Sequence, residues 1–115
     1  MKSIVFKGKF GYLEEKINKG TIVFCHFEPK DNEEKIFRAA EKFVGLSSDN
    51  LILVPFAHLS EKSVSKKEAK IFFENLVKKC GKLRKQTVIA IPFGVEKEFF
   101  LYAPAKNSAI KFMRF

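Results

Sequence analysis

The chain has 115 residues with a formal net charge of +9, and 46% of its residues are hydrophobic. This length fits one domain spanning residues 1–115, whose core needs no disulfide or metal to hold it together. The two cysteines, Cys25 and Cys80, lack the spacing of a zinc site or a disulfide framework, and no apolar run is long enough for a signal peptide or a membrane span. We therefore expect a soluble protein of a reducing cytoplasm, without a metal or other cofactor.

The positive charge is concentrated in one part of the chain. Residues 61–85 hold nine lysines and arginines against three glutamates. Such a cluster favours a polyanionic partner, most simply nucleic acid. The alternative is a lysine-rich solvated surface, which is common in heat-adapted proteins.

The N-terminal third predicts strands. Residues 3–6 are typical of a first strand, and Gly8 and Gly11 predict a turn after which residues 10–13 return antiparallel. A polar connection that ends at residues 18–20 leads to residues 21–27, which are β-branched and aromatic throughout. We expect a central strand there, buried on both faces.

A helix and a second buried strand follow. Asp31 or Asn32 is placed to cap the helix and Gly45 to end it, with five apolar residues on one face: Ile36, Phe37, Ala40, Phe43 and Val44. Residues 51–54 then form an apolar run that stops at Pro55. A strand, a helix and a strand in this order predict a right-handed unit with parallel strands.

The second helix has the clearest pattern in the chain. Ser65 and Glu68 form a capping box, and Gly81 is placed to end the helix. Its apolar stripe holds Ala69, Phe72, Phe73, Leu76, Val77 and Cys80, and its opposite face holds Lys67, Lys70, Glu74 and Lys78. We expect Cys80 to be buried and structural.

The C-terminal third predicts a strand at residues 87–91 and a strand at residues 98–102 paired to it. Residues 108–115 fit either a final strand or an irregular tail. The predicted fold class is therefore α/β (α+β), with a mixed sheet and two main helices.

Two similar corners could carry chemistry. Pro55-Phe56 ends one buried strand and precedes His58, and Pro92-Phe93 ends another and precedes Lys97. Ligands of open α/β sheets bind beyond the carboxyl ends of strands, so we expect the corners to flank one pocket. A histidine and a lysine there could position water or stabilise an oxyanion. The alternatives are a structural histidine and a solvated lysine, with Cys25 and His26 as plain core residues.

Both corners resemble a known family. The strings VPFAHLS at residues 54–60 and IPFGVEKEF at residues 91–99 are similar to two blocks of the editing domain of archaeal threonyl-tRNA synthetases. With no other synthetase segment in the sequence, the chain resembles a free-standing relative. The resemblance implies a D-aminoacyl-tRNA deacylase-like fold, a homodimer, and hydrolysis in trans of serine mischarged on threonine tRNA.

The resemblance also implies roles for single residues. Lys97 would place the attacking water or stabilise developing charge, and His58 would orient nearby groups. Substrate would contact Pro55, Phe56, Ala57, Phe27 and Glu96, while tRNA phosphates would contact Lys67, Lys70, Lys78, Arg84 and Lys85.

Six residues at four sites depart from the family pattern. Glu96 replaces a tyrosine, Phe27 a small apolar residue, and Lys7-Gly8-Lys9 a polar His-Ser-Asp, while Ile110 falls near the place of an expected carboxylate. These changes motivate an alternative, a catalytically inactive relative that binds tRNA or a synthetase through its basic face.

Overall fold

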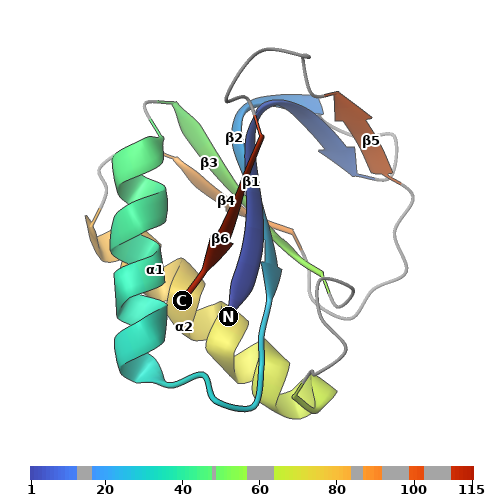
Figure 1. The fold of residues 1–115 in the computed structure, drawn as a ribbon. Helices are drawn as coiled ribbons and strands as arrows, with labels where there is room; N and C mark the ends of the chain where they lie inside the picture. The colour runs from blue at the N-terminus through green and yellow to red at the C-terminus, as the bar shows by residue number, and fades with distance from the viewer. Residues whose placement is uncertain (13–16, 48, 57–63, 84–86, 92–98, 103–109) are drawn as a thin grey trace.

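The computed structural model describes residues 1–12, 17–47, 49–56, 64–83, 87–91, 99–102 and 110–115. Its sheet has the strand order β4-β3-β2-β1-β5, and β6 also pairs with β1 (Figure 1). The strands are β1 (Lys2–Tyr12), β2 (Ile17–His26), β3 (Asn50–Pro55), β4 (Val88–Ala90), β5 (Phe99–Tyr102) and β6 (Ile110–Arg114), and the helices are α1 (Glu33–Leu46) and α2 (Lys66–Leu83). Since β2, β3 and β4 are parallel and the pairings of β1 are antiparallel, the sheet is mixed, which confirms the predicted fold class.

The predicted β2-α1-β3 unit is confirmed, and β3 runs parallel to β2. The Asn32 side chain caps α1 by accepting a hydrogen bond from the Lys35 backbone amide at 2.9 Å. In α2, the Ser65 hydroxyl accepts from the Glu68 amide at 3.2 Å, which is one half of the predicted capping box. Local side-chain chemistry therefore starts both helices where the sequence indicated.

The predicted turn at Gly8 and Gly11 is wrong. The first strand continues through both glycines to Tyr12, and the residues opposite it belong to β2. Residues 18–20, expected as a connection, lie within β2, where Gly20 packs against the backbone of Asn50. Glycine is needed at that position because a Cβ would lie only 2.3 Å from the Asn50 carbonyl oxygen.

Both helices extend past the glycines expected to end them. Gly45 lies inside α1, which ends at Leu46, and Gly81 lies inside α2, which ends at Leu83. The predicted apolar face of α1 is also wrong at Phe37, which is 40% exposed, with the Lys79 ammonium 5.1 Å from its ring centre. A cation over an aromatic face is a favourable contact, so this ring is used at the surface and not in the core.

The C-terminal strands pair differently from the prediction. The fifth strand, β5, pairs with residues 9–12 of β1 and not with β4. The final strand, β6, forms and pairs with residues 2–6 of the same strand. One long strand, β1, therefore carries β2 along one edge and both C-terminal strands along the other.

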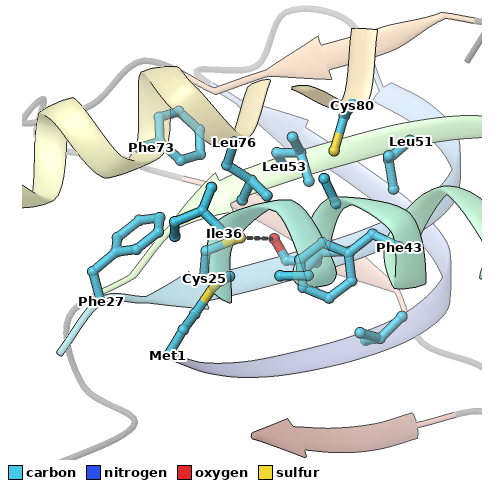
Figure 2. Packing of buried hydrophobic residues seen from close by; sticks show 14 residues of the cluster. Met1, Cys25, Phe27, Ile36, Phe43, Leu51, Leu53, Phe73, Leu76 and Cys80 are labelled. Carbon is cyan, nitrogen blue, oxygen red and sulfur yellow. Dashed lines mark hydrogen bonds between the residues drawn. The ribbon is translucent and has the colours of Figure 1, made fainter. Parts of the chain in front are cut away.

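The core has a layer on each face of the sheet. On the helix side, α1 and α2 cover a cluster that includes Met1, Phe43, Leu53 and Phe73 (Figure 2). On the other side, Phe6, Phe10, Phe24 and Ile52 and their neighbours form a second cluster. The central strands β2 and β3 are thus buried on both faces, as their continuous apolar runs predicted.

In the part of the chain that the structure describes, no helix is long and apolar enough to cross a membrane.

Candidate active site at the ends of β2 and β3

The predicted corner starts where β2 and β3 end side by side. Cys25 of β2 is the register partner of Pro55 of β3, and the Phe56 amide donates to the Cys25 carbonyl oxygen at 2.8 Å. Pro55 is the last residue of β3, as predicted, and it is buried, while the bond from Phe56 continues the pairing one residue further. The backbone direction of the corner is therefore set by β2.

The strand that leads to the second corner lies directly beside β3. Since β4 pairs in parallel with β3, and the Ile91 amide donates to the Leu53 carbonyl oxygen at 3.0 Å, both strands run toward the same edge of the sheet. Pro92 to Lys97 lie outside the described residues. The described strands thus end as neighbours where the two corners begin.

Two predicted substrate-contacting rings lie on opposite faces of the sheet. Phe56 is half-buried on the helix-free side, with its ring 5.3 Å from that of Phe24. Phe27 is 4% exposed on the helix side, where its ring lies 5.9 Å from that of Phe72 and 6.4 Å from that of Phe73. The Phe27 ring is therefore turned toward α2 and away from the Phe56 side of the strand ends.

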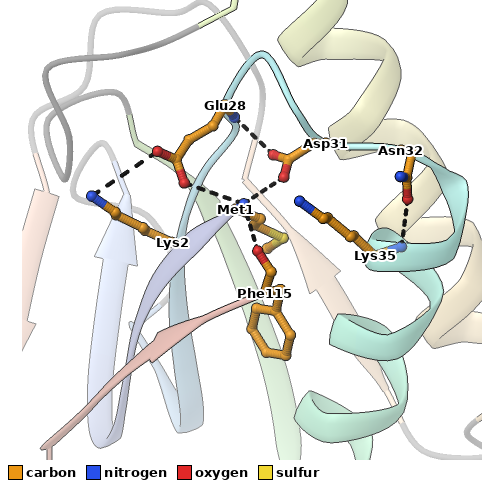
Figure 3. Close-up of polar contacts among 7 residues, drawn as sticks. All are labelled: Met1, Lys2, Glu28, Asp31, Asn32, Lys35 and Phe115. Atoms are coloured by element: carbon orange, nitrogen blue, oxygen red, sulfur yellow. Dashed lines mark hydrogen bonds and ion pairs between the residues drawn. The ribbon is translucent and has the colours of Figure 1, made fainter.

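Polar groups hold the segment that follows Phe27. The α-amino group of Met1 forms an ion pair with Asp31 and lies 3.3 Å from Glu28 Oε1, and it donates to the Phe115 carbonyl oxygen at 3.3 Å (Figure 3). We call these four groups the N-terminal clamp. Asp31 also accepts from the Glu28 amide at 2.7 Å, and the side chains of Met1 and Asp31 are fully buried. The clamp joins the start of β1, the end of β2 and the C-terminus.

The other polar residues near the β2 end are buried. Cys25 and His26 are each 1% exposed, in agreement with their interpretation as core residues. Burial, and secondarily the nearby Cys80 thiol, raises the pKa of the Cys25 thiol well above its usual value, so this group stays protonated and is a poor nucleophile. Within the described ranges, no three His, Cys, Asp or Glu side chains lie close enough together to hold a metal ion.

The predicted tRNA-binding lysines of α2 are all exposed. Lys67, Lys70 and Lys78 lie away from the buried stripe, as the helical spacing indicated. The helix carries six lysines against two glutamates, whereas α1 carries three basic against three acidic residues. The basic face of α2 is therefore a local property of one helix.

Several predicted site residues fall outside the described part of the chain. These are Ala57, His58, Arg84, Lys85, Glu96 and Lys97. Their roles stay predictions. Ile110, at the place of the expected carboxylate, is 60% exposed on β6.

Sequence reasoning missed the N-terminal clamp. The sequence predicts for Asp31 only a role as helix cap, but Asn32 caps α1 and Asp31 binds the amino terminus. No local pattern signals this contact, because Met1 is 30 residues from Asp31 and 114 residues from Phe115. The one available signal was that Asp31 and Asn32 competed for a single capping position.

Comparison with known proteins agrees with this geometry. A solved structure titled "c-Myc DNA Unwinding Element Binding Protein" matches with a TM-score of 0.83 at 11% sequence identity, covering 100% of this chain and 99% of that one. At this identity the likeness shows the fold alone, a deacylase-like fold. A comparison with curated protein sequences found no match. Residues 5–109 match the family model of the archaea-specific editing domain of threonyl-tRNA synthetase, and the chain therefore belongs to this family.

Proposed function

We propose that the chain is an aminoacyl-tRNA editing hydrolase, a single domain that acts in trans and removes serine from mischarged threonine tRNA. Family membership supports tRNA editing in general, and the action in trans and the choice of serine are our proposals. The observation that supports a hydrolase is the parallel, adjacent arrangement of β3 and β4, because the strands that lead to the two family-like corners end side by side. The direction of the Phe27 ring adds support, since it leaves the Phe56 side of the strand ends clear of this bulky residue.

The proposed chemistry needs few protein groups. Water adds to the ester carbonyl, the oxyanion collapses, and the ribose oxygen of the tRNA leaves with a proton that the water supplied. An oriented water and a donor for the oxyanion are sufficient, so no protein nucleophile is required. In this scheme Lys97 stabilises the oxyanion or places the water, His58 orients its neighbours, and the backbone from Pro55 to Ala57 forms a wall for the amino acid.

The test is hydrolysis of seryl- and threonyl-charged threonine tRNA by the purified protein. We expect serine to be released faster than threonine. For Lys97→Ala we expect a rate of serine release about 10²- to 10³-fold lower than that of the wild type, which is the usual cost of losing one oxyanion donor. Lys42→Ala is the matched control, because Lys42 is an exposed lysine on α1 and should not affect the rate. Release no faster than the uncatalysed rate would contradict the proposal.

A second function is favoured by the charge of α2. In this alternative the chain is inactive and binds tRNA, or threonyl-tRNA synthetase, through Lys67, Lys70 and Lys78, with Arg84 and Lys85 extending the surface. We expect replacement of the three helix lysines by glutamine to weaken tRNA binding and to lower the salt slope by about 2 to 3, since each phosphate contact contributes about 0.7 to 0.9.

A matched variant distinguishes position from total charge. Glutamine at Lys35, Arg38 and Lys42 removes the same charge from α1, where acidic residues balance it. Equal losses of tRNA affinity in the two triple variants would mean that only the net charge of the protein matters for binding. An unchanged affinity in the α2 variant would identify its lysines as a solvated face.

We also propose that the protein is a homodimer of the archaeal cytoplasm. Support comes from β6, where Ile110 and Phe112 are 60% and 54% exposed on the side of the sheet away from the helices. Large apolar side chains on an edge strand are typical of association surfaces. Sedimentation should give the mass of a dimer, and Phe112→Lys should shift it toward the monomer; a wild-type monomer at micromolar concentration would contradict the proposal.

A further inference from the structure

A row of exposed side chains crosses three strands at the end of the sheet far from the N-terminus. Lys9 of β1 is opposite Lys19 of β2 on one side and opposite Tyr102 of β5 on the other. Directly paired residues point to the same face, so the two ammonium groups and the ring share one surface. All three are exposed, Tyr102 by 52%, and Lys7 is exposed on the same face two residues along β1. We call these four residues the hairpin patch.

The bend of the sheet exposes this face. By strand alternation, Lys7 and Lys9 point to the same side as Val5, which packs under the helices. In Figure 1, however, the later half of β1 and the start of β2 curve away from α1 and α2 toward β5. The hairpin patch is therefore on the helix side of the sheet but beyond the area that the helices cover.

The pairing of Lys9 with Lys19 is unfavourable in the isolated protein. Like charges directly opposite in an antiparallel pair repel, because their Cβ atoms are only about 5 Å apart. Among the described residues, no carboxylate forms an ion pair with Lys7, Lys9 or Lys19. The Asp49 carboxylate accepts a hydrogen bond at 3.3 Å from the hydroxyl of Thr21, which is opposite Lys7, but it forms no ion pair with the patch lysines. Within the described part of the chain, the charge of these lysines is therefore not paired, and an anion from outside would compensate it.

The tyrosine determines which anion fits. Lysines alone attract any polyanion, but an exposed aromatic ring beside them provides a surface on which an unpaired base can stack. Stacked bases and neutralised phosphates together are the usual way in which proteins hold single-stranded nucleic acid. A duplex keeps its bases stacked on each other and would leave the ring unused.

We propose that the hairpin patch binds a single-stranded RNA segment, with phosphates at Lys9, Lys19 and Lys7 and a base on Tyr102. The inference relies on the proposed function only in taking RNA as the partner. It involves neither the Pro-Phe corners nor the lysines of α2. It assigns a role to charged residues of β1 and β2 for which the editing chemistry has no use.

The test is fluorescence anisotropy of a labelled 12-nucleotide oligouridine, which carries no amino acid and no tRNA fold. Glutamine at both Lys9 and Lys19 should lower the affinity and reduce the slope of log K against log salt by about 1.4, since each contact to a single strand contributes about 0.7. Arginine at both positions should preserve the slope. The glutamine variant should unfold at an equal or higher temperature, because a repulsion is removed, so weaker binding cannot be attributed to misfolding.

A second pair of variants isolates the ring. Tyr102→Ala should weaken binding by about five-fold or more with the salt slope unchanged, as expected for loss of one stacked base, whereas Tyr102→Phe should bind like the wild type. An unchanged affinity in the double glutamine variant would overturn the proposal. It would also be overturned if Tyr102→Ala bound normally and a 12-base-pair RNA duplex competed as well as the single strand, which would indicate a nonspecific polyanion surface. None of these outcomes depends on deacylation, so failure of the proposed enzyme function would leave this test intact.

Discussion

Removal of the Asp31 charge should destabilise the whole fold. In Asp31→Asn the shape of the side chain is kept, but the fully buried ammonium of Met1 loses its ion-pair partner. Loss of one partner of a buried pair costs about 3 to 5 kcal/mol, and we expect about 3 kcal/mol because Glu28 stays 3.3 Å from the ammonium and is partly solvated. With an unfolding entropy of about 2.1 cal/mol/K per residue, this predicts a melting temperature lower by about 12 °C.

The measurement is urea and thermal unfolding followed by circular dichroism. Glu41→Gln is the matched control, since it removes an exposed carboxylate from α1 and should change stability by less than about 0.5 kcal/mol. Acetylation of the Met1 amino group tests the same contact from the other side, because it leaves Asp31 buried without its cation. The two changes combined should cost less than the sum of their separate effects by about 1 kcal/mol or more.

Two results would refute this reasoning. A loss of stability below about 1 kcal/mol in Asp31→Asn would mean that Glu28 or water stabilises the Met1 ammonium in place of the Asp31 carboxylate. Strict additivity of acetylation and Asp31→Asn would mean that the amino group and Asp31 affect stability independently.

Further predictions concern the sheet and the buried thiol. Gly20→Ala should lower stability by at least about 2 kcal/mol or shift the β2–β3 pairing, because the added Cβ would lie 2.3 Å from the Asn50 carbonyl oxygen. Gly45→Ala has open space around its Cβ and should raise stability by up to about 1 kcal/mol. Urea unfolding of both variants measures these changes. Since the pKa of Cys25 is raised in the folded state, stability should be fully present below the unfolded thiol pKa of about 8.5 and fall at higher pH. Cys25→Ala should flatten this alkaline decline, measured as the urea midpoint from pH 7 to 10, and an equal decline in both proteins would contradict the assignment to Cys25.

Features set by neighbouring residues could be predicted from the sequence. The start of α1 at Asp31 or Asn32, the buried stripe of α2 and the parallel pairing of β2 with β3 were all indicated correctly, because each depends on capping chemistry, helical spacing or a short connection. Helix ends were predicted less well. Gly45 and Gly81 are tolerated inside helices that pack on the sheet, so a glycine alone did not identify the last turn.

Features set by distant residues could not be predicted in this way. Gly8 and Gly11 indicated a turn, yet both stay in β1 because β2 supplies backbone partners to both and β5 pairs with Gly11 on the other side. The predicted partner of β5 was wrong for the same reason. The short corner after β4 suggested a hairpin, but the pairing joins residues 9–12 of β1 with residues 99–102. In the candidate site, the strand ends are neighbours, as the two corners predicted.

The distribution of charge separates the two explanations of the net charge of +9. A solvated surface adapted to heat mixes lysine with glutamate so that each exposed helix is nearly neutral, which describes α1. The excess is instead placed on α2 and on the hairpin patch, where Lys9 and Lys19 face each other although their repulsion lowers stability. Positive charge at a place where it lowers folding stability is explained better by binding of an anionic partner than by solubility. Salt should therefore stabilise the folded protein mainly through the hairpin patch, and glutamine at Lys9 and Lys19 should remove more of this salt dependence than glutamine at Lys35 and Lys42 of α1.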